Sequence, residues 1–486
     1  MSSVEKRRSL APDLEVSRVL TGLWQVADME RDGDPLDAEA AAAALVPYVE
    51  AGFTTFDMAD HYGSAETIAA ALRATLGPSG EVQLLTKWVP PPGPQTRGDV
   101  RAAVQRSLDR LGVERIDLLQ FHAWSYDDPR YLDCLFHLQE LRQEGLIGHL
   151  GLTNFDTAHL RVVVRSGIEI VSNQISFSVI DRRPLAGMTR FCSENGIQLL
   201  AYGTLAGGLL TERFLDVRAP LQDELKTWSQ KKYRRFIDAA GGWSGFQAVL
   251  HALHGVATRL DASIANVAAR YVLDQQAVAG IIIGARPGQS EHIRENLRLF
   301  ELSLDDTSRR EIETAVARLE PIPGDSGDEY RRPPFLTSSG DLSDHLASVP
   351  PPYETRSGAD GRACALSGTA WEDRGGFCRA VRTGARILVS GTTATHGDRP
   401  IGGSDPAAQL HFIIDKIEGA VRSLGGRFNE IVRTRIYLRN VEDWEAVTRA
   451  HGERFGEVLP VNTLIQAALV GDEYLVEMEA EAVVSQ

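Results

Sequence analysis

The chain has 486 residues, of which 43% are hydrophobic and 24% are charged, as in a soluble globular protein. This length exceeds one ordinary core, so we expect at least two domains. The net charge of −15 argues against a broad surface for nucleic acid or an anionic membrane. The first ten residues lack the apolar core of a signal peptide, no apolar run reaches the length of a membrane span, and the four cysteines have no metal-like spacing. These features predict a cytoplasmic protein with no metal, membrane or nucleic-acid partner.

Short apolar runs alternate with segments of helical period through the first two-thirds of the chain. Early runs lie at 54–56, 82–85 and 116–121, and helical segments such as 69–76 and 104–111 lie between them. Buried strands that alternate with amphipathic helices predict parallel βα units. Eight such runs in about 300 residues predict a closed (β/α)8 barrel of the TIM type, whose chemistry lies where the strands end.

The two ends of the predicted barrel and its longest loop follow from the same pattern. Residues 14–24 predict a hairpin strand followed by the first barrel strand. Residues 203–245 are the longest irregular stretch, which predicts a long loop at the active end of the barrel. An eighth strand at 280–283 and a closing helix at 305–319 complete the barrel.

The composition changes after the barrel. Residues 321–352 are rich in proline, glycine and serine, which predicts an interdomain linker. A small α+β domain is predicted beyond it, with strands near 363–367, 377–382, 387–390, 431–438, 463–468 and 474–484 and helices at 405–424 and 444–455. The predicted domains are therefore a barrel at 1–320, a linker at 321–352 and an α+β domain at 353–486.

Four side chains with complementary chemistry follow the ends of successive predicted strands. Asp57 ends the second run, Tyr62 lies in the turn after it, Lys87 ends the third run and His122 ends the fourth. A lysine cation favours the phenolate of a neighbouring tyrosine, an aspartate holds the lysine in place, and a histidine can orient a carbonyl oxygen. Together they predict a general-acid site for hydride transfer to a carbonyl, with the hydride supplied by a cofactor.

The residues around these four also carry a family pattern. The sequence Asp57-x-Ala59-x-x-Tyr62-Gly63-x-x-Glu66, with a lysine and a histidine closing the next two strands, resembles the aldo-keto reductases. Segments 107–111, 151–155 and 283–296 agree with it, so the resemblance covers about 12–320. It implies an NAD(P)-dependent oxidoreductase that interconverts an aldehyde, ketone or sugar carbonyl with an alcohol, with Asp57, Tyr62, Lys87 and His122 as catalytic residues.

The same resemblance implies which residues hold the cofactor. Thr153, Asn154 and Gln174 would bind the nicotinamide carboxamide, and Tyr202 would stack on its ring. Arg286 would contact a 2′-phosphate, so NADP(H) is favoured over NAD(H). The expected cofactor-binding residues are Gly22, Trp24, Thr153, Asn154, Gln174, Tyr202, Gly203, Leu205, Gly207, Gly284, Arg286, His292, Glu295 and Asn296.

The second domain resembles another family. Segments 377–382 and 387–392, with Gly425-Gly426 and the ending 476–480, resemble the Rid (YjgF-like) reactive intermediate deaminases. This resemblance implies a homotrimer formed through the C-terminal domain. Active deaminases of the family hold an imino-acid carboxylate with an arginine shortly after a Pro-x pair, whereas Asn462 follows Pro460-Val461 here. An amide cannot make that bidentate charged contact, so we expect a domain for assembly or ligand binding.

Two other functions stay open from the sequence. In one, the Rid-like domain hydrolyses an imine and the barrel reduces the product. In the other, the barrel is a redox-sensing regulatory protein that holds its cofactor without rapid turnover. The small-molecule substrate and the direction of the reaction also stay open.

Overall fold

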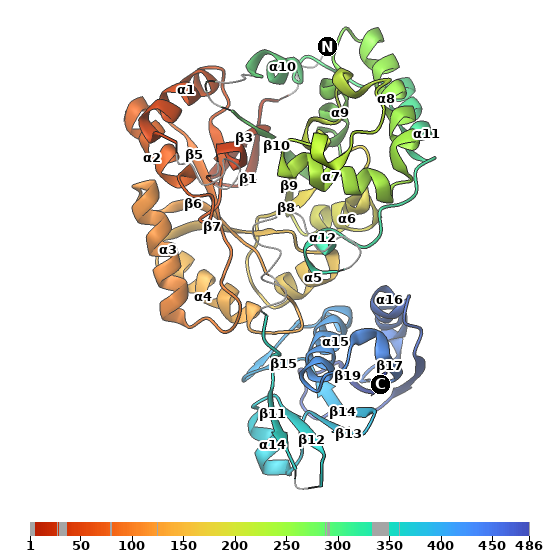
Figure 1. Ribbon diagram of the computed structural model, residues 1–486. Helices are drawn as coiled ribbons and strands as arrows, with labels where there is room; N and C mark the ends of the chain where they lie inside the picture. Colours follow the sequence, from red (N-terminus) through yellow and green to blue (C-terminus); the bar gives the residue numbers. More distant parts are fainter. Residues whose placement is uncertain are drawn as a thin grey trace.

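The computed structural model describes residues 5–26, 28, 36–77, 80–123, 125–286, 288, 292–332, 349–358 and 360–485. It shows a large N-terminal body and a smaller C-terminal body (Figure 1). An antiparallel hairpin of β1 (Arg7–Ala11) and β2 (Leu14–Ser17) precedes the first barrel strand and packs on the barrel interior. The predicted hairpin strand therefore pairs with a strand that begins at Arg7. In the part of the chain that the structure describes, no helix has the length and apolar character needed to cross a membrane.

The predicted eight-stranded parallel barrel is confirmed. The strands close in the order β10-β3-β4-β5-β6-β7-β8-β9. Their bounds are β3 Val19–Gly22, β4 Thr55–Asp57, β5 Gln83–Trp88, β6 Ile116–Phe121, β7 Ile147–Thr153, β8 Ser172–Ser176, β9 Gln198–Tyr202 and β10 Val278–Gly284. Every residue of β4 and β8 is buried, because side chains fill the barrel on one side and helices cover the other.

Helices surround the barrel, most of them between its strands and two after the last strand. They are α1 Ala38–Glu50, α2 Ala65–Leu76, α3 Arg97–Leu111, α4 Tyr131–Gln143, α5 Thr157–Arg165, α6 Met188–Glu194, α7 Trp228–Ala239, α8 Gly242–Arg259, α9 Ile264–Leu273, α10 Ile293–Arg298 and α11 Asp306–Val316. Helix α3 illustrates their origin: Thr96 and Asp99 form a capping box at its start, and Val100, Val104 and Leu108 bury one face at helical spacing.

The prediction of one long loop at 203–245 is wrong, because this stretch contains α7 and the start of α8. Thr227 caps α7 by accepting a hydrogen bond from the Gln230 amide, and Tyr233, Phe236 and Ile237 bury its apolar face. The four residues between Trp228 and Tyr233 are all polar, so the start of the helix lacks apolar residues at helical spacing.

The smaller body is the predicted α+β domain. Its sheet has the order β11-β12-β13-β14-β19-β17-β18. The strands are β11 Glu354–Ser357, β12 Ala363–Leu366, β13 Ala380–Thr383, β14 Arg386–Thr393, β17 Ile431–Leu438, β18 Val461–Gln466 and β19 Val476–Val483. Helices α15 (Pro406–Ser423) and α16 (Trp444–Phe455) match the two predicted helices, whereas α14 (Ala370–Gly375) and β11 were not predicted.

Helix α15 lies between its own sheet and helix α5 of the barrel (Figure 1). Its residues are buried almost without interruption from Ala407 to Ile417, as expected for a helix covered on both faces. The proline-containing middle of the predicted linker, 333–348, lies outside the described residues. The part before it, 324–332, packs on the barrel and includes the short helix α12 (Asp328–Arg331).

Candidate active site

The turn after β4 carries Tyr62 to the end of β5. The backbone amide of Asp60 donates to the Lys87 carbonyl at 3.0 Å, which ties the turn to the neighbouring strand. Gly63 then adopts a left-handed φ of 62°, which glycine tolerates without strain. The local backbone therefore brings Tyr62 and Lys87 together before α2 begins.

Lys87 and Asp57 form a buried ion pair beside Tyr62. Lys87 Nζ lies 2.6 Å from Asp57 Oδ2 and 2.9 Å from the Met58 carbonyl oxygen. The same Nζ lies 5.4 Å from the centre of the Tyr62 ring. Only 5% of the Lys87 side chain and 6% of the Asp57 side chain are exposed, so water screens the cation weakly. We call Lys87, Asp57 and Tyr62 the Lys87 group.

Two glutamines hold the second oxygen of the Asp57 carboxylate. Gln174 Nε2 donates to Asp57 Oδ1 at 2.7 Å, and Gln120 Nε2 donates to it at 3.1 Å. Gln174 Nε2 also lies 2.9 Å from Gln120 Oε1. These bonds satisfy a carboxylate whose burial would otherwise be costly. Gln174, expected at the cofactor, thus also fixes Asp57. Gln120 was missed because the sequence does not say which strand residues point into the barrel.

His122 follows β6 and has 4% of its surface exposed. Burial first, and then the nearby Arg331, hold the pKa of His122 well below its ordinary value. Its ring lies edge-on to Tyr330, with 5.1 Å between ring centres. A neutral imidazole can donate an N–H to a carbonyl oxygen without adding another positive charge to the site.

One cavity of about 520 Å³ connects most of the predicted site. It is lined by the four predicted catalytic residues, Asp57, Tyr62, Lys87 and His122. The predicted cofactor residues along it are Gly22, Trp24, Thr153, Asn154, Gln174, Tyr202, Gly203, Leu205, Gly207, Gly284, Arg286 and His292. Glu295 and Asn296 lie on α10 and are not part of the lining; Glu295 is exposed and Asn296 is buried.

Two buried oxygen atoms in this cavity suit an amide ligand. Thr153 Oγ1 and Gln25 Oε1 are buried and have no hydrogen-bond partner among the described residues. Tyr202 donates its hydroxyl to Asn154 Oδ1 at 2.7 Å, so the predicted stacking residue is held beside the predicted carboxamide site. Buried polar atoms are normally paired, so a carboxamide that offers N–H donors fits this wall.

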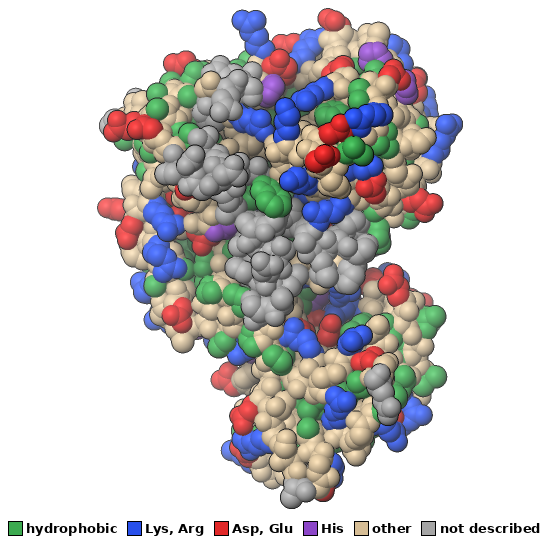
Figure 2. Space-filling view, viewed as in Figure 1, with side chains coloured by type: hydrophobic (Ala, Val, Ile, Leu, Met, Phe, Trp, Pro, Cys, Tyr) green, Lys and Arg blue, Asp and Glu red, His purple; other side chains and the backbone are tan. Residues whose placement is uncertain are grey.

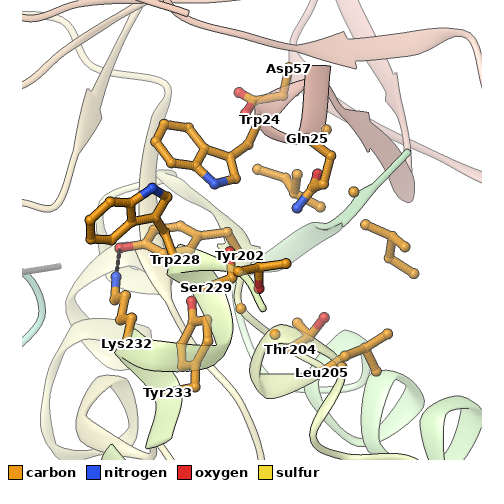
Figure 3. A pocket seen from close by; sticks show the side chains of 18 of the residues that line it. Trp24, Gln25, Asp57, Tyr202, Thr204, Leu205, Trp228, Ser229, Lys232 and Tyr233 are labelled. Atoms are coloured by element: carbon orange, nitrogen blue, oxygen red, sulfur yellow. Dashed lines mark hydrogen bonds between the residues drawn. The ribbon is translucent and has the colours of Figure 1, made fainter. Parts of the chain in front are cut away.

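A second lysine lies in the same cavity. Lys232 Nζ of α7 lies 3.4 Å from the Tyr202 hydroxyl, a contact drawn in Figure 3, and 3.3 Å from the Tyr330 hydroxyl. Glu329 Oε1 is 3.7 Å from the same Nζ, and Glu329 Oε2 accepts from Arg183 at 2.8 Å. We call Lys232, Glu329, Tyr202 and Tyr330 the Lys232 group.

Sequence reasoning missed Lys232 and Tyr330. Lys232 lies in the stretch predicted as a loop, and Tyr330 lies on α12 in the predicted linker. The helical spacing of Tyr233 and Phe236 could have revealed α7, and hence a helix at the cavity. No sequence signal marks Tyr330, whose position depends on how α12 packs.

The rim of the cavity is basic. Arg213, Arg286 and His292 belong to the lining and are exposed. Figure 2 shows lysine and arginine side chains gathered between α10 and α7. Such a rim suits the phosphates of a dinucleotide despite the negative charge of the whole chain.

In the second domain, the position where an arginine would hold a carboxylate is occupied by Asn462. Its Nδ2 donates to Thr434 Oγ1 at 2.8 Å, and the residue is exposed on β18. Glu477, on β19, is half-buried, and burial raises the pKa of its carboxyl. The nearby Arg379 donates to Gly391 O at 2.8 Å and Thr392 Oγ1 at 2.9 Å.

Comparisons with known proteins assign a family to each of the two domains. Residues 18–317 match the model of the Aldo/keto reductase family, and residues 368–484 match the model described as Endoribonuclease L-PSP. An uncharacterized protein of Streptomyces coelicolor is 39% identical over 117 residues, which are 24% of this chain and 87% of that protein.

The barrel is similar to named oxidoreductases. The NADH-specific methylglyoxal reductase of Escherichia coli is 26% identical over 332 residues, which are 63% of this chain and 97% of that protein. The glycerol dehydrogenase of Gluconobacter oxydans has the same barrel fold, with a TM-score of 0.53 at 24% identity over 67% of this chain and 98% of that chain. Because the first family model spans more than half of its residues, the chain belongs to the aldo/keto reductase family, and it carries in addition a Rid/YjgF-like domain.

Proposed function

We propose that the chain is an NAD(P)(H)-dependent oxidoreductase that interconverts a carbonyl group and an alcohol. The observation that carries this proposal is the Lys87 group in a cavity that the predicted cofactor residues also line. Tyr62 donates a proton to the carbonyl oxygen as negative charge develops on it, and the Lys87 cation, held by Asp57, stabilises the phenolate that remains. His122 orients the carbonyl oxygen.

A bound nicotinamide supplies the hydride, which no side chain can provide. Thr153, Asn154 and Gln174 would hold the carboxamide, and Tyr202 would stack on the ring. Arg286, exposed at the basic rim, offers a fixed charge for a 2′-phosphate, so we propose that NADP(H) is favoured over NAD(H). The related enzyme of Escherichia coli is named for NADH, and titration of this chain with both cofactors tests the preference.

The substrate side of the cavity is mostly aromatic. Trp24 lies edge-on to Tyr62 with 4.9 Å between ring centres, and Trp228 and Tyr330 also line the cavity. Lys232 adds a cation to this wall. We propose small carbonyl compounds whose remote end carries oxygen atoms, such as 2-oxoaldehydes or sugars, over purely aliphatic ketones.

The test is a panel of carbonyls with NADPH and NADH, followed by the loss of reduced nicotinamide absorbance. Methylglyoxal, benzaldehyde, glyoxylate and an aldose are suitable probes. We expect cofactor oxidation with at least one of them, and alcohol oxidation in the reverse direction. If the cofactor binds tightly but no probe is converted at a rate that reaches the rate of cofactor release, the result would instead favour the redox-sensing regulatory protein.

For the second domain we propose assembly into a homotrimer. Strand β18 lies at one edge of the seven-stranded sheet, and five of its six residues are exposed. Val461 and Ile465 on this strand are 63% and 48% exposed, and Leu459 before it is 79% exposed. An unpaired edge with apolar side chains is a liability unless another copy covers it. Asn462 at the carboxylate position argues for this role over imine hydrolysis.

Light scattering on the full chain tests the assembly. We expect the mass of three chains, and a smaller species when Val461→Lys and Ile465→Lys place charges on the edge. Lysine substitutions at the exposed Val217 and Leu221, which lie on the barrel, are the control and should leave the mass unchanged. A monomeric wild-type chain would contradict the proposal.

A further inference from the structure

The segment around helix α12 contacts both loops that carry His122 and Asn154. Arg331 Nη1 donates to the Asn154 carbonyl oxygen at 2.6 Å, and Arg331 Nε and Nη2 donate to the Ala123 carbonyl oxygen at 3.1 and 2.6 Å. Ala123 directly follows His122. Gly327 packs so closely that a Cβ on it would lie 1.9 Å from the Asn154 carbonyl oxygen. The segment therefore holds both loops by their backbones.

The guanidinium of Arg331 rests on a stack of two rings. It lies 4.3 Å from the centre of the Tyr126 ring. Tyr126 is in turn parallel to the imidazole of His159, with 3.5 Å between centres and 9° between planes. Tyr126 is 6% exposed and His159 is fully buried. Because a planar cation packs well on an aromatic face, the position of these rings limits where Arg331 can lie.

His159 is also the point where the second domain contacts this stack. Its Nδ1 lies 2.7 Å from both oxygens of Asp156, the N-cap of α5. Its Nε2 lies 3.1 and 3.0 Å from the two oxygens of Asp415, which belongs to α15 and is fully buried. Both ring nitrogens must carry a hydrogen to donate to carboxylates on both sides, so the imidazole is charged. Arg454 of α16 completes the cluster with a bond to Asp415 at 2.7 Å.

We propose that the C-terminal domain is a structural component of the barrel's active site. Asp415 holds His159, the rings of His159 and Tyr126 hold Arg331, and Arg331 positions the loops after β6 and β7. Arg331 is thus a positioning residue, since it contacts the backbones of these loops and not the reacting groups. The expected loss of enzyme activity rests on the proposed function, whereas the expected loss of rigidity in the two loops does not.

Another ion pair between the domains provides a matched control. Asp405, at the start of α15, lies 2.9 Å from Arg161 Nη1 and 3.3 Å from Arg165 Nε. Arg161 packs on the ring of Phe191 in α6, away from the Tyr126 stack. Asp405→Asn keeps the hydrogen bond that caps α15 but removes the charge. It weakens the same interface without touching the Tyr126 stack.

The experiment compares Asp415→Asn with Asp405→Asn in the full chain by hydrogen exchange and mass spectrometry. For Asp415→Asn we expect faster exchange in 120–126, 151–157 and 325–332, far from the substituted residue in sequence. NADPH affinity, measured by fluorescence, should fall about tenfold, because Asn154 is no longer fixed. With methylglyoxal as probe, kcat should fall along with kcat/KM. Asp405→Asn should change exchange only where α5 meets α15.

Unchanged exchange in 325–332 for Asp415→Asn, in a protein whose interface has loosened, would overturn the proposal. If Asp415→Asn does not fold, Tyr126→Leu and Tyr126→Phe replace it: the leucine variant should show the same loosening and the phenylalanine variant should not. Equal behaviour of these two variants would also overturn it. A wild-type protein that reduces no probe refutes the proposed function alone, because exchange and cofactor affinity still test the positioning.

Discussion

The Lys87 group and the Lys232 group place two lysines beside tyrosines in one cavity, but they are held in different ways. Lys87 has a carboxylate partner at 2.6 Å and lies on a barrel strand. Lys232 lies on α7, with Glu329 at 3.7 Å, and Glu329 is shared with Arg183. The closer pair on the more rigid element suits proton transfer, where small displacements are costly. The looser pair on peripheral helices suits binding of the remote end of a substrate.

The largest expected effect separates the two tyrosines. Tyr62→Phe should lower the rate of carbonyl reduction by about a hundredfold or more, because the proton donor is lost, while cofactor affinity stays the same. Tyr330→Phe is the matched control and should change kcat by less than about fivefold. Steady-state rates and NADPH fluorescence titrations check both. Equal losses in the two variants would remove the distinction between the groups.

A smaller effect is expected at the second lysine. Lys232→Met should raise KM about tenfold for glyoxylate, whose carboxylate is attracted by the cation, with little change in kcat. Benzaldehyde, which is neutral, should show a much smaller change. A loss of kcat with both substrates would instead mean that Lys232 takes part in the chemical step.

A third effect is expected at the rim of the cavity, where Arg286 would contact the cofactor. Arg286→Ala should weaken NADPH about tenfold and leave NADH within about twofold, because only NADPH carries the 2′-phosphate. Fluorescence titration with both cofactors measures this. Equal losses would show that Arg286 does not distinguish them.

The smallest effect concerns two carboxylates on the segment before the linker. Burial opposes ionisation of Glu329, but Arg183 and Lys232 lower its pKa to about 2. Burial, with the nearby Asp156, raises the pKa of Asp325 to about 6. Asp325 therefore adds stability below its unfolded pKa, and this stability is lost as the pH rises toward 6.

Asp325→Asn should remove this pH dependence. Between pH values of about 4 and 7 the wild-type protein should lose on the order of 1–2 kcal/mol more stability than the variant. Urea unfolding at several pH values measures it. A parallel decline in both proteins would show that Asp325 is ionised without cost.

The sequence was sufficient for the parts of the site that the barrel itself determines. Asp57, Lys87 and His122 end successive strands, and parallel strands in a closed barrel bring such positions together. Lys232 and Tyr330 could not be found in this way, because they meet only after α7 and α12 pack against the barrel. The contact of α15 with the barrel left no such signal: residues 406–423 have the pattern of an amphipathic helix, with His411, Asp415, Glu418 and Arg422 along one side, and only the packed structure buries His411 and Asp415.

The position of α15 also affects how the protein unfolds. Buried apolar residues form one continuous cluster from Val19 in the barrel to Ala482 in the second domain. On α15, a Cβ at Gly419 would lie only 2.4 Å from the Asp127 carbonyl oxygen of the barrel, so the backbones nearly touch. Unfolding of either domain would therefore expose buried apolar residues of the other domain to water. The chain should therefore melt in a single cooperative transition in calorimetry, unlike domains that are joined only by a linker.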